Sequence, residues 1–300
     1  MDGAGAPRWF EDALRAPRES REVDAGGCRI HYLRWGDPSR PGLVLVHGGG
    51  AHAEWWSFLA PLLTRGYHVA ALDLSGHGDS GRRPEYLPQR WCEEILAVAR
   101  HAGMTSPPVV VGHSLGGLVT IVTAAQHGDR LAGAVIVDSP VRRPAPESER
   151  LRYSAAFQHA KVYPDRQTAR AHFRLVPDQP CENQFILDHV AWHSMRELPG
   201  GGWSWKFDPQ VFNSHVPQLS EQLASVRVRV ALFRGDHSTV VPEETSQYMY
   251  ELLGRNAPVV EIPDAHHHLI LDQPLAFIAA LRAILADWEH SVPRRPRAGA

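Results

Sequence analysis

The segment Val109–Thr120 constrains the fold of this chain more than any other. It reads VVVGHSLGGLVT: a short β-branched run, a serine between two glycines, and then an apolar stretch that suits a buried helix. A strand therefore passes into a helix through Gly112–Gly116, with no residues left for a loop. Such a turn forces Ser114 into a strained backbone conformation, and glycines two positions before and after it remove side chains that would collide there.

The same turn places the Ser114 hydroxyl where a negative charge is stabilised. It lies at the amino end of a helix, where unpaired N–H groups and the helix dipole favour a developing negative charge. A Gly-x-Ser-x-Gly turn between a strand and a helix resembles the nucleophile elbow of the α/β-hydrolase family. The resemblance implies that Ser114 is a nucleophile, whereas the alternative is a glycine-rich turn that serves only tight packing.

Composition and charge limit the class of protein. A chain of 300 residues with 43% hydrophobic content can bury a large core, which suits one α/β domain with an insertion. The formal net charge of −2 offers no basic surface for nucleic acid and favours a small-molecule substrate. No apolar run approaches the roughly eighteen residues of a membrane span, so we expect no membrane insertion. Nothing in the sequence indicates the oligomeric state.

The cysteines and the N-terminal residues predict a cytoplasmic protein. The three cysteines lie far apart and lack metal or redox spacing, which is typical of isolated thiols in a reducing compartment. The first twenty residues are charged and contain prolines, unlike a signal peptide. We expect residues 1–19 and 291–300 to be flexible termini.

Apolar runs alternate with helical patterns along most of the chain. The predicted buried strands are Gly42–Val46, His68–Leu74, Val109–Val111, Leu131–Val137, Val226–Arg234 and Val259–Ile262. The predicted helices between and after them are Ala53–Arg65, Pro88–His101, Glu243–Leu253 and Leu275–Trp288, and Ser20–Asp24 with Cys28–Trp35 predicts a hairpin before them. This alternation predicts a doubly wound, mostly parallel α/β sheet over residues 20–140 and 221–290, with its site at the carboxyl ends of the strands.

The alternation stops over residues 141–220. This segment lacks a buried-strand run and contains helical stretches at Glu147–Ala160 and Gln184–Arg196. An insertion at this place in the α/β-hydrolase family forms a helical cap over the active site, and we expect the same here. Trp203 and Trp205 belong to a dense aromatic stretch that either packs the cap or forms a wall of the substrate site.

The first central strand leads into His47-Gly48-Gly49-Gly50. In the family such a segment donates one N–H group to the oxyanion hole, which here would be that of Gly49, and the second would be that of Leu115. We expect Gly48 and His113, which neighbour these donors, to line the substrate site. The alternative is a flexible loop before the next helix.

The general base is expected after the last strand. The family carries its catalytic histidine about seven residues before a proline, and counting back from Pro274 gives His267. Three adjacent histidines, from His266 to His268, also suggest a metal site. Side chains adjacent in sequence point apart, however, so we expect no metal and no cofactor.

The acid of the triad departs from the commonest family pattern. That pattern places an aspartate three residues after the glycine that ends the next-to-last strand, but Ser238 stands three residues after Gly235. Asp236 and Asp138 are the two alternatives. We favour Asp138, because it leaves the end of a strand beside the nucleophile strand, with Ser238 as an additional hydrogen-bond partner of His267.

These residues predict a serine hydrolase that cleaves a carboxylic ester through an acyl-enzyme intermediate. The same triad serves lactonases and carbon–carbon bond hydrolases, so the bond type stays open. Epoxide hydrolases and dehalogenases of this fold use an aspartate nucleophile, which Ser114 argues against. A non-catalytic receptor or ligand-binding protein on this fold is the alternative from another class.

Overall fold

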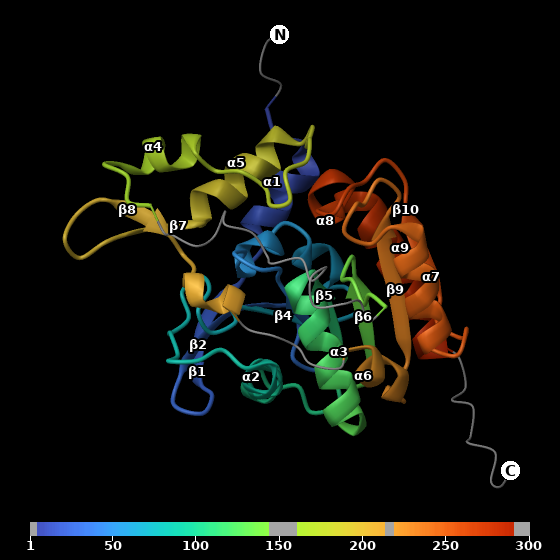
Figure 1. The fold of residues 1–300 in the computed structure, drawn as a ribbon. Helices are drawn as coiled ribbons and strands as arrows, with labels where there is room; N and C mark the ends of the chain where they lie inside the picture. The colour runs from blue at the N-terminus through green and yellow to red at the C-terminus, as the bar shows by residue number, and fades with distance from the viewer. Residues whose placement is uncertain (1–4, 144–160, 214–218, 291–300) are drawn as a thin grey trace, which may run out of the picture.

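The structure is a computed structural model that describes residues 5–143, 161–213 and 219–290. At its centre is an eight-stranded sheet with the order β1-β2-β4-β3-β5-β6-β9-β10 (Figure 1). Its strands are β1 (Glu19–Asp24), β2 (Arg29–Trp35), β3 (Gly42–Val46), β4 (His68–Leu72), β5 (Val109–His113), β6 (Gly133–Val137), β9 (Val230–Gly235) and β10 (Val259–Ile262). The pairs β1–β2 and β2–β4 are antiparallel, and the other neighbours are parallel. This confirms the predicted doubly wound, mostly parallel sheet and its hairpin start.

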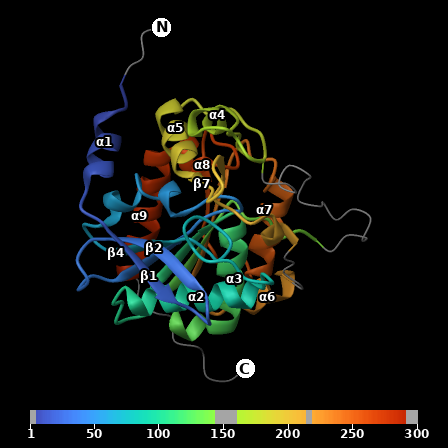
Figure 2. The ribbon, with the colours of Figure 1, turned by 90° about the vertical axis from the view of Figure 1, so that its left-hand side faces the viewer.

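Helices cover both faces of the sheet, because the central strands are apolar on both sides. Leu43 and Leu45 of β3 belong to the core on one face, and Val44 and Val46 belong to the core on the other. The first face is covered by α1 (Arg8–Arg15), α9 (Pro274–His290) and the short α8 (Leu269–Asp272), and the second by α2 (Pro88–His101), α3 (Leu115–His127), α6 (Leu219–Ser225) and α7 (Glu243–Leu252) (Figure 2). A short 3₁₀ turn, Gly128–Arg130, follows α3.

Some of the predicted elements differ in the structure. The predicted helix Ala53–Arg65 is wrong: the chain forms two 3₁₀ helices, η1 (Ala53–Trp55) and η2 (Ala60–Leu63). Pro61 lacks the N–H group that a continuous α-helix would need at that position. The strand predicted from Val226 begins only at Val230, because the Val226 N–H bonds the Leu223 carbonyl and closes α6 instead.

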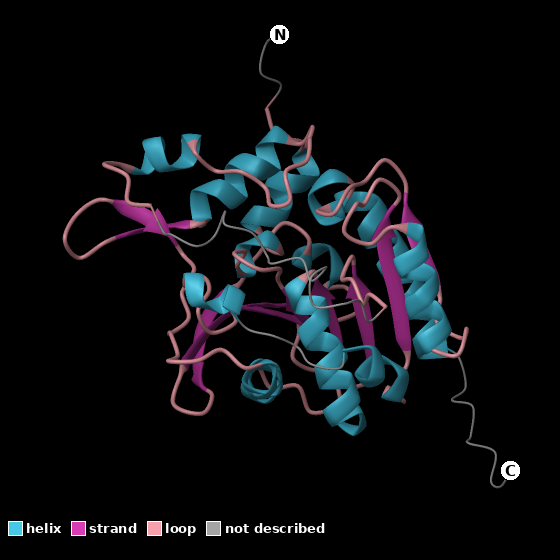
Figure 3. Cartoon of the chain, viewed as in Figure 1, coloured by secondary structure: helices cyan, strands magenta, loops and turns pink. Residues whose placement is uncertain are grey.

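The segment between β6 and α6 contains both helices and strands (Figure 3). Its described elements are α4 (Arg166–Ala171), α5 (Gln184–His193), β7 (Met195–Glu197), β8 (Trp203–Trp205) and η6 (Pro209–Asn213). The predicted helix Glu147–Ala160 lies outside the described residues. The other predicted helix ends at His193, because the chain turns into β7, which pairs antiparallel with β8. Gly201 and Gly202 make the turn with φ of +85° and +81°.

This segment packs on the loop that follows β4. The Gly78 N–H donates to the Lys206 carbonyl (2.7 Å), and the Asp208 N–H donates to the Gly76 carbonyl (2.7 Å). The loop leaves the carboxyl end of a parallel strand, so the contact lies at the edge of the sheet where a site is expected. Among the described helices, none has the length and apolar character needed to cross a membrane.

Candidate active site

Ser114 occupies the turn between β5 and α3 in a strained conformation. Its φ of 53° and ψ of −120° lie outside the regions that most non-glycine residues adopt. A Cβ atom on Gly112 would lie 2.2 Å from the Gly116 carbonyl oxygen, and one on Gly116 would lie 2.5 Å from the oxygens of Val46 and His47. The two glycines therefore allow the helix to begin directly against the neighbouring strand β3.

Three side chains from different parts of the chain form one hydrogen-bonded series. The Ser114 Oγ lies 3.0 Å from His267 Nε2, and His267 Nδ1 lies 2.7 Å from Asp138 Oδ2. Asp138 is fully buried, His267 is 3% exposed and Ser114 is 9% exposed, so the serine is the most accessible of the three. The Nδ1 proton faces the carboxylate, which leaves a lone pair on Nε2 directed at the serine hydroxyl.

The Asp138 carboxylate is held by two further groups. Asp138 follows β6 with a φ of 46°, and its Oδ1 accepts a hydrogen bond from the Gly235 N–H (3.2 Å). The Ser238 hydroxyl donates to Asp138 Oδ2 (2.6 Å), whereas the sequence prediction paired it with His267. Ser238 thus acts on the histidine only through the aspartate. It is itself oriented by the N–H groups of Val240 and Val241 (3.2 and 3.1 Å), which donate to its oxygen.

Asp236, the other aspartate considered, binds backbone instead. Its two carboxylate oxygens accept the N–H groups of Asp264 and Ala265, each at 3.0 Å. Desolvation would raise the pKa of this carboxyl, but these N–H donors outweigh it and lower the pKa. Asp236 therefore ties the end of β9 to the loop that carries His267.

Two N–H groups beside the serine have no partner in the part of the chain that the structure describes. Within the described residues, neither the Gly49 N–H nor the Leu115 N–H donates to a protein acceptor. A Cβ atom on Gly48 would lie 3.2 Å from the Ser114 Cβ, and one on Gly49 would lie 3.8 Å from the Leu115 side chain. The loop after β3 and the start of α3 are thus adjacent, as an oxyanion hole requires.

His47 holds the loop after β3 in place. Its Nε2 accepts the Leu74 N–H (3.0 Å) and its Nδ1 donates to the Gly48 carbonyl (2.7 Å). These two bonds define a single neutral tautomer. Burial lowers the pKa of His47, which keeps the ring uncharged in this role.

His113 packs against His267. Its Nε2 donates to the His267 carbonyl (2.9 Å), and the two rings are 4.9 Å apart between centroids. Burial, reinforced by the neighbouring His267, lowers the pKa of His113 to about 3. His113 was predicted to line the substrate site, and in the structure its bond to the His267 carbonyl fixes the backbone of the loop that carries the histidine.

The aromatic residues of the inserted segment divide into two places. Trp203 and Trp205 pack with Tyr163 and Met195 in a small cluster within the segment itself. Phe212, which follows them, reaches the loop after β3: its ring carbon lies 3.0 Å from where a Gly49 Cβ would stand. Phe212 was not predicted from the sequence, where its one signal is that it stands nine residues after Trp203.

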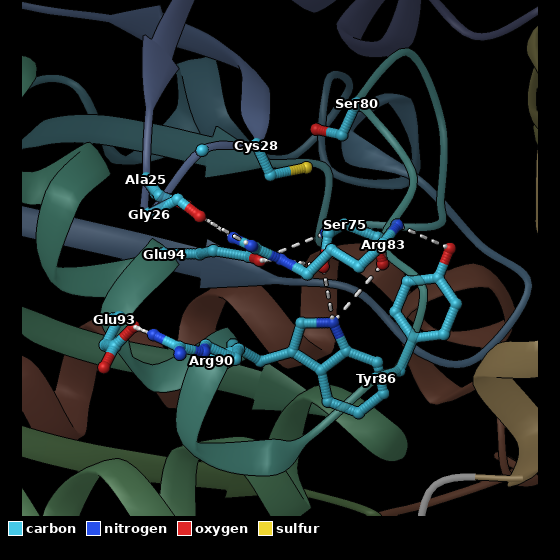
Figure 4. A network of polar contacts seen from close by, with 12 residues as sticks. Ala25, Gly26, Cys28, Ser75, Ser80, Arg83, Tyr86, Arg90, Glu93 and Glu94 are labelled. Carbon is cyan, nitrogen blue, oxygen red and sulfur yellow. Dashed lines mark hydrogen bonds and ion pairs between the residues drawn. The ribbon is translucent and has the colours of Figure 1, made fainter.

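A buried ion pair supports the loop that meets this segment (Figure 4). Arg83 Nε lies 2.9 Å from Glu94 Oε1, and Glu94 Oε2 accepts the Ser75 N–H (2.8 Å). Burial raises the pKa of the Glu94 carboxyl, although Ser75 and Arg83 oppose the shift. The nearby Tyr86 hydroxyl donates to Asp208 Oδ2 (3.0 Å), so the network extends from the core to the segment that carries Phe212.

Four groups among the described residues bring metal-ligating side chains together. They are His113–His267–His268, Glu54–His189–His193, His31–Asp73–Asp79 and Asp236–His237–Asp264. In the third group the Asp73 carboxylate is saturated by His31 Nδ1 and by the N–H groups of Ala53 and Asp79. Asp73 is thus a structural residue of its loop.

A separate cavity of about 500 Å³ lies between α7 and β10, away from Ser114.

Known proteins resemble this chain in sequence and in fold. A family model described as the alpha/beta hydrolase family matches residues 43–281. The chain is 29% identical over 273 residues to esterase Rv0045c of Mycobacterium tuberculosis, covering 89% of each chain. It is 27% identical over 267 residues to the sn-1-specific diacylglycerol lipase ABHD11 of Mus musculus, covering 84% of this chain and 83% of that one. The solved structure of E-2-(acetamidomethylene)succinate hydrolase is similar in fold, with a TM-score of 0.78 and 21% identity over 90% of this chain and all of that one.

Proposed function

The chain is an enzyme of the alpha/beta hydrolase family, and we propose that it is a serine hydrolase that cleaves a carboxylic ester through an acyl-enzyme intermediate. The observation that carries this proposal is the hydrogen-bonded series from Ser114 through His267 to Asp138. A neutral serine is a weak nucleophile, and this arrangement supplies the base that it needs. The relatives named as an esterase and a lipase support an ester as the substrate.

In the first half-reaction the Ser114 Oγ attacks the ester carbonyl carbon while its proton passes to His267 Nε2. The Asp138 carboxylate stabilises the imidazolium that forms and holds the ring in the required tautomer. When the tetrahedral intermediate collapses, the carbon–oxygen bond to the alcohol breaks and His267 returns the proton to the leaving alkoxide. Ser114 is left as an acyl ester.

In the second half-reaction water takes the place of the serine hydroxyl. His267 removes a proton from the water, the resulting hydroxide attacks the acyl carbon, and the proton then returns to the Ser114 oxygen. The carboxylic acid is released and the serine is restored. In both tetrahedral intermediates the negative oxygen lies within reach of the Gly49 and Leu115 N–H groups, which have no protein acceptor among the described residues.

We further propose that residues 141–220 form a cap on a core of residues 20–140 and 221–290. Its support is the contact of Lys206 and Asp208 with the loop after β4, and the approach of Phe212 to Gly49. An acyl group bonded to Ser114 would extend toward Phe212, whereas Trp203 and Trp205 would stiffen the cap from within. Gly48 and His113 would border the same site.

The test is hydrolysis of p-nitrophenyl esters by the wild type, Ser114→Ala and His267→Ala. Each variant should lose on the order of 10⁶-fold in kcat, since the two residues act as one unit. The matched control is His266→Ala, which removes an adjacent imidazole that faces Asp272 instead. A fluorophosphonate should label Ser114 alone. Labelling of another serine, or wild-type activity in Ser114→Ala, would refute the assignment, and stoichiometric binding without turnover would support a binding protein.

A further inference from the structure

The loop that carries His267 is held from two sides. On the side of the core, His113 Nε2 donates to the His267 carbonyl (2.9 Å), and the Asp236 carboxylate accepts two N–H groups that come earlier in the loop. The next backbone group along the chain, the His268 N–H, is bound by the inserted segment instead. The base of the proposed triad therefore stands between the core and this segment.

A short stretch before α5 carries the side chains that bind the loop. Gln179 Oε1 accepts the His268 N–H (2.9 Å), and Gln179 Nε2 donates to the two carboxylate oxygens of Asp272 (3.0 and 2.9 Å). Asn183 Nδ2 donates to the carbonyls of Leu271 and Asp272 at the end of α8 (2.8 and 2.9 Å). The start of α5 thus lies against α8 (Figure 2).

Asp272 extends this contact to the residue before His267. Its Oδ2 accepts the His266 N–H (2.8 Å), and its side chain is only 6% exposed. Burial raises the pKa of the Cys181 thiol to about 12, so the thiol keeps the proton with which it also binds this carboxylate. A buried carboxylate that loses a donor is destabilised. Loss of the Gln179 amide would therefore loosen the N–H groups on both sides of His267.

The His267 ring has to satisfy two partners at once. Its Nδ1 lies 2.7 Å from Asp138 Oδ2, and its Nε2 lies 3.0 Å from the Ser114 Oγ. The ring turns only about two side-chain bonds, so its place follows the backbone of residues 266–268. A displacement of about 1 Å at a reacting group can cost about 100-fold in rate. Bonds that fix this backbone therefore bear on the reaction without touching the substrate.

We propose that Gln179 of the inserted segment is a positioning residue for the general base His267, with Asn183 holding α8 behind it. The segment then has two tasks, because Phe212 borders the acyl group while Gln179 sets the geometry of the base. The inference rests on the proposed function, which makes His267 the base. A contact that only fastened the segment to the core would affect stability and leave the base unchanged.

The first experiment compares Gln179→Met with Gln184→Met in p-nitrophenyl acetate hydrolysis. Methionine keeps the length of the side chain and removes both polar ends. Gln184 is the matched control, because its amide bonds the exposed Asp188 carboxylate within α5 (3.1 Å). We expect Gln179→Met to lower kcat about 10- to 100-fold with KM changed by no more than about twofold, and Gln184→Met to keep the wild-type constants.

The second experiment exchanges the amide and the carboxylate. Gln179→Glu alone sets two carboxylates against each other and should lower kcat at least as much as Gln179→Met. Gln179→Glu combined with Asp272→Asn restores the bonds, because the new carboxylate accepts the His268 N–H and the new amide, whose own oxygen accepts the His266 N–H. This double variant should recover kcat to within about threefold of the wild type, as coupled neighbours do.

A third measurement does not depend on turnover. The proton between His267 Nδ1 and Asp138 gives a low-field resonance in the proton NMR spectrum. We expect this resonance in the wild type, in Gln184→Met and in the double variant, and its weakening in Gln179→Met and Gln179→Glu. If Gln179→Met does not fold, Gln179→Asn takes its place, because its amide is one methylene too short to span His268 and Asp272.

Three results would overturn the inference: wild-type kcat in Gln179→Met, a lower melting temperature of that variant with kcat and the resonance unchanged, or a double variant as slow as Gln179→Glu. Absence of turnover in the wild type, with a resonance that still depends on Gln179, would instead refute only the proposed function.

Discussion

Asp138 and Asp236 lie in neighbouring loops, and their surroundings give them different tasks. The Asp138 carboxylate is buried and meets His267, Gly235 and Ser238. The Asp236 carboxylate is partly exposed and accepts the N–H groups of Asp264 and Ala265 in the loop before His267, with His237 Nε2 3.9 Å from it. The Asp138 carboxylate lies behind the imidazole, where it can stabilise a positive charge on His267. The Asp236 carboxylate instead holds the loop before His267 in position through its backbone N–H groups.

This difference predicts opposite effects of two matched substitutions. Asp138→Asn should lower kcat by as much as ~10⁴-fold, because an amide favours the wrong histidine tautomer and cannot stabilise the imidazolium. Asp236→Asn should retain most of the turnover and lower the free energy of unfolding by about 1 kcal/mol, because one of its two backbone bonds is lost. Ester turnover and denaturant unfolding of both variants measure this. The reverse ranking in kcat would make Asp236 the acid.

At the scale of elements, the junction of β5 and α3 depends on close approach of backbones. Gly116→Ala should lower the free energy of unfolding by about 1–3 kcal/mol, because the new Cβ would lie 2.5 Å from the carbonyl oxygens of Val46 and His47. Alanine normally stabilises a helix relative to glycine. A loss of stability would therefore show that the steric clash at residue 116 outweighs the gain in helix propensity. Gly66→Ala is the control, because a Cβ there meets no atom within 4 Å. Equal stability of the two variants in thermal unfolding would contradict this account.

The inserted segment allows a test of substrate selection. Phe212→Ala should change the ranking of acyl chain lengths, by about tenfold between acetate and a long-chain ester, because Phe212 borders Gly49. Trp205→Ala should instead lower the melting temperature and reduce turnover of every ester alike, since Trp205 packs against Tyr163 and Phe173. The two roles are distinguished by measuring turnover of a panel of p-nitrophenyl esters and the melting temperature of each variant. A change of ranking in Trp205→Ala alone would place the acyl group at β8.

At the scale of the whole molecule, one carboxylate joins three separate parts of the chain. Glu54 in η1 accepts two bonds from Arg18 near the N-terminus (2.7 and 2.8 Å), and His189 of α5 lies 3.7 Å from it. Burial alone would raise the pKa of Glu54, but the Arg18 guanidinium outweighs burial and holds that pKa at about 2. The N-terminal segment, the core and the inserted segment are thus linked at a single charge.

The linkage predicts an acid-dependent loss of stability. A carboxyl with a folded pKa of about 2 and an ordinary unfolded value stabilises the fold above about pH 4.5 and loses that contribution as the pH falls toward 2. Glu54→Gln should therefore be less stable than the wild type at pH 6, and the difference should shrink between pH 4.5 and 2.5. The melting temperatures of the wild type and the variant across this pH range measure the difference. The control is Glu22→Gln, which removes one partner of an exposed ion pair with Arg29. A difference that is constant with pH would exclude the ion pair as its cause.

Local sequence was sufficient for much of the fold. The helix Pro88–His101 and the strand Val259–Ile262 have the predicted bounds, because apolar periodicity and the flanking prolines and glycines act within a few residues. Ala53–Arg65 was wrong because the tertiary packing of its bulky apolar residues and the missing N–H of Pro61 favour 3₁₀ turns. The β7–β8 hairpin was missed because its strands have three residues each, too few for a periodic pattern.

By itself the sequence determined the elbow at Ser114, the parallel sheet and the short set of residues able to act with the serine, because turn sterics and hydrophobic periodicity are local. Only the tertiary structure decided how that set combines. The partners of His267 are separated from it by 153 and 129 positions, and a hydrogen bond at such separation depends on strand order and loop course. The carboxyl ends of parallel strands meet at one edge of the sheet. For this reason the tertiary structure also decided that Ser238 bonds Asp138, that Asp236 bonds the loop before His267, and that His113 packs beside His268.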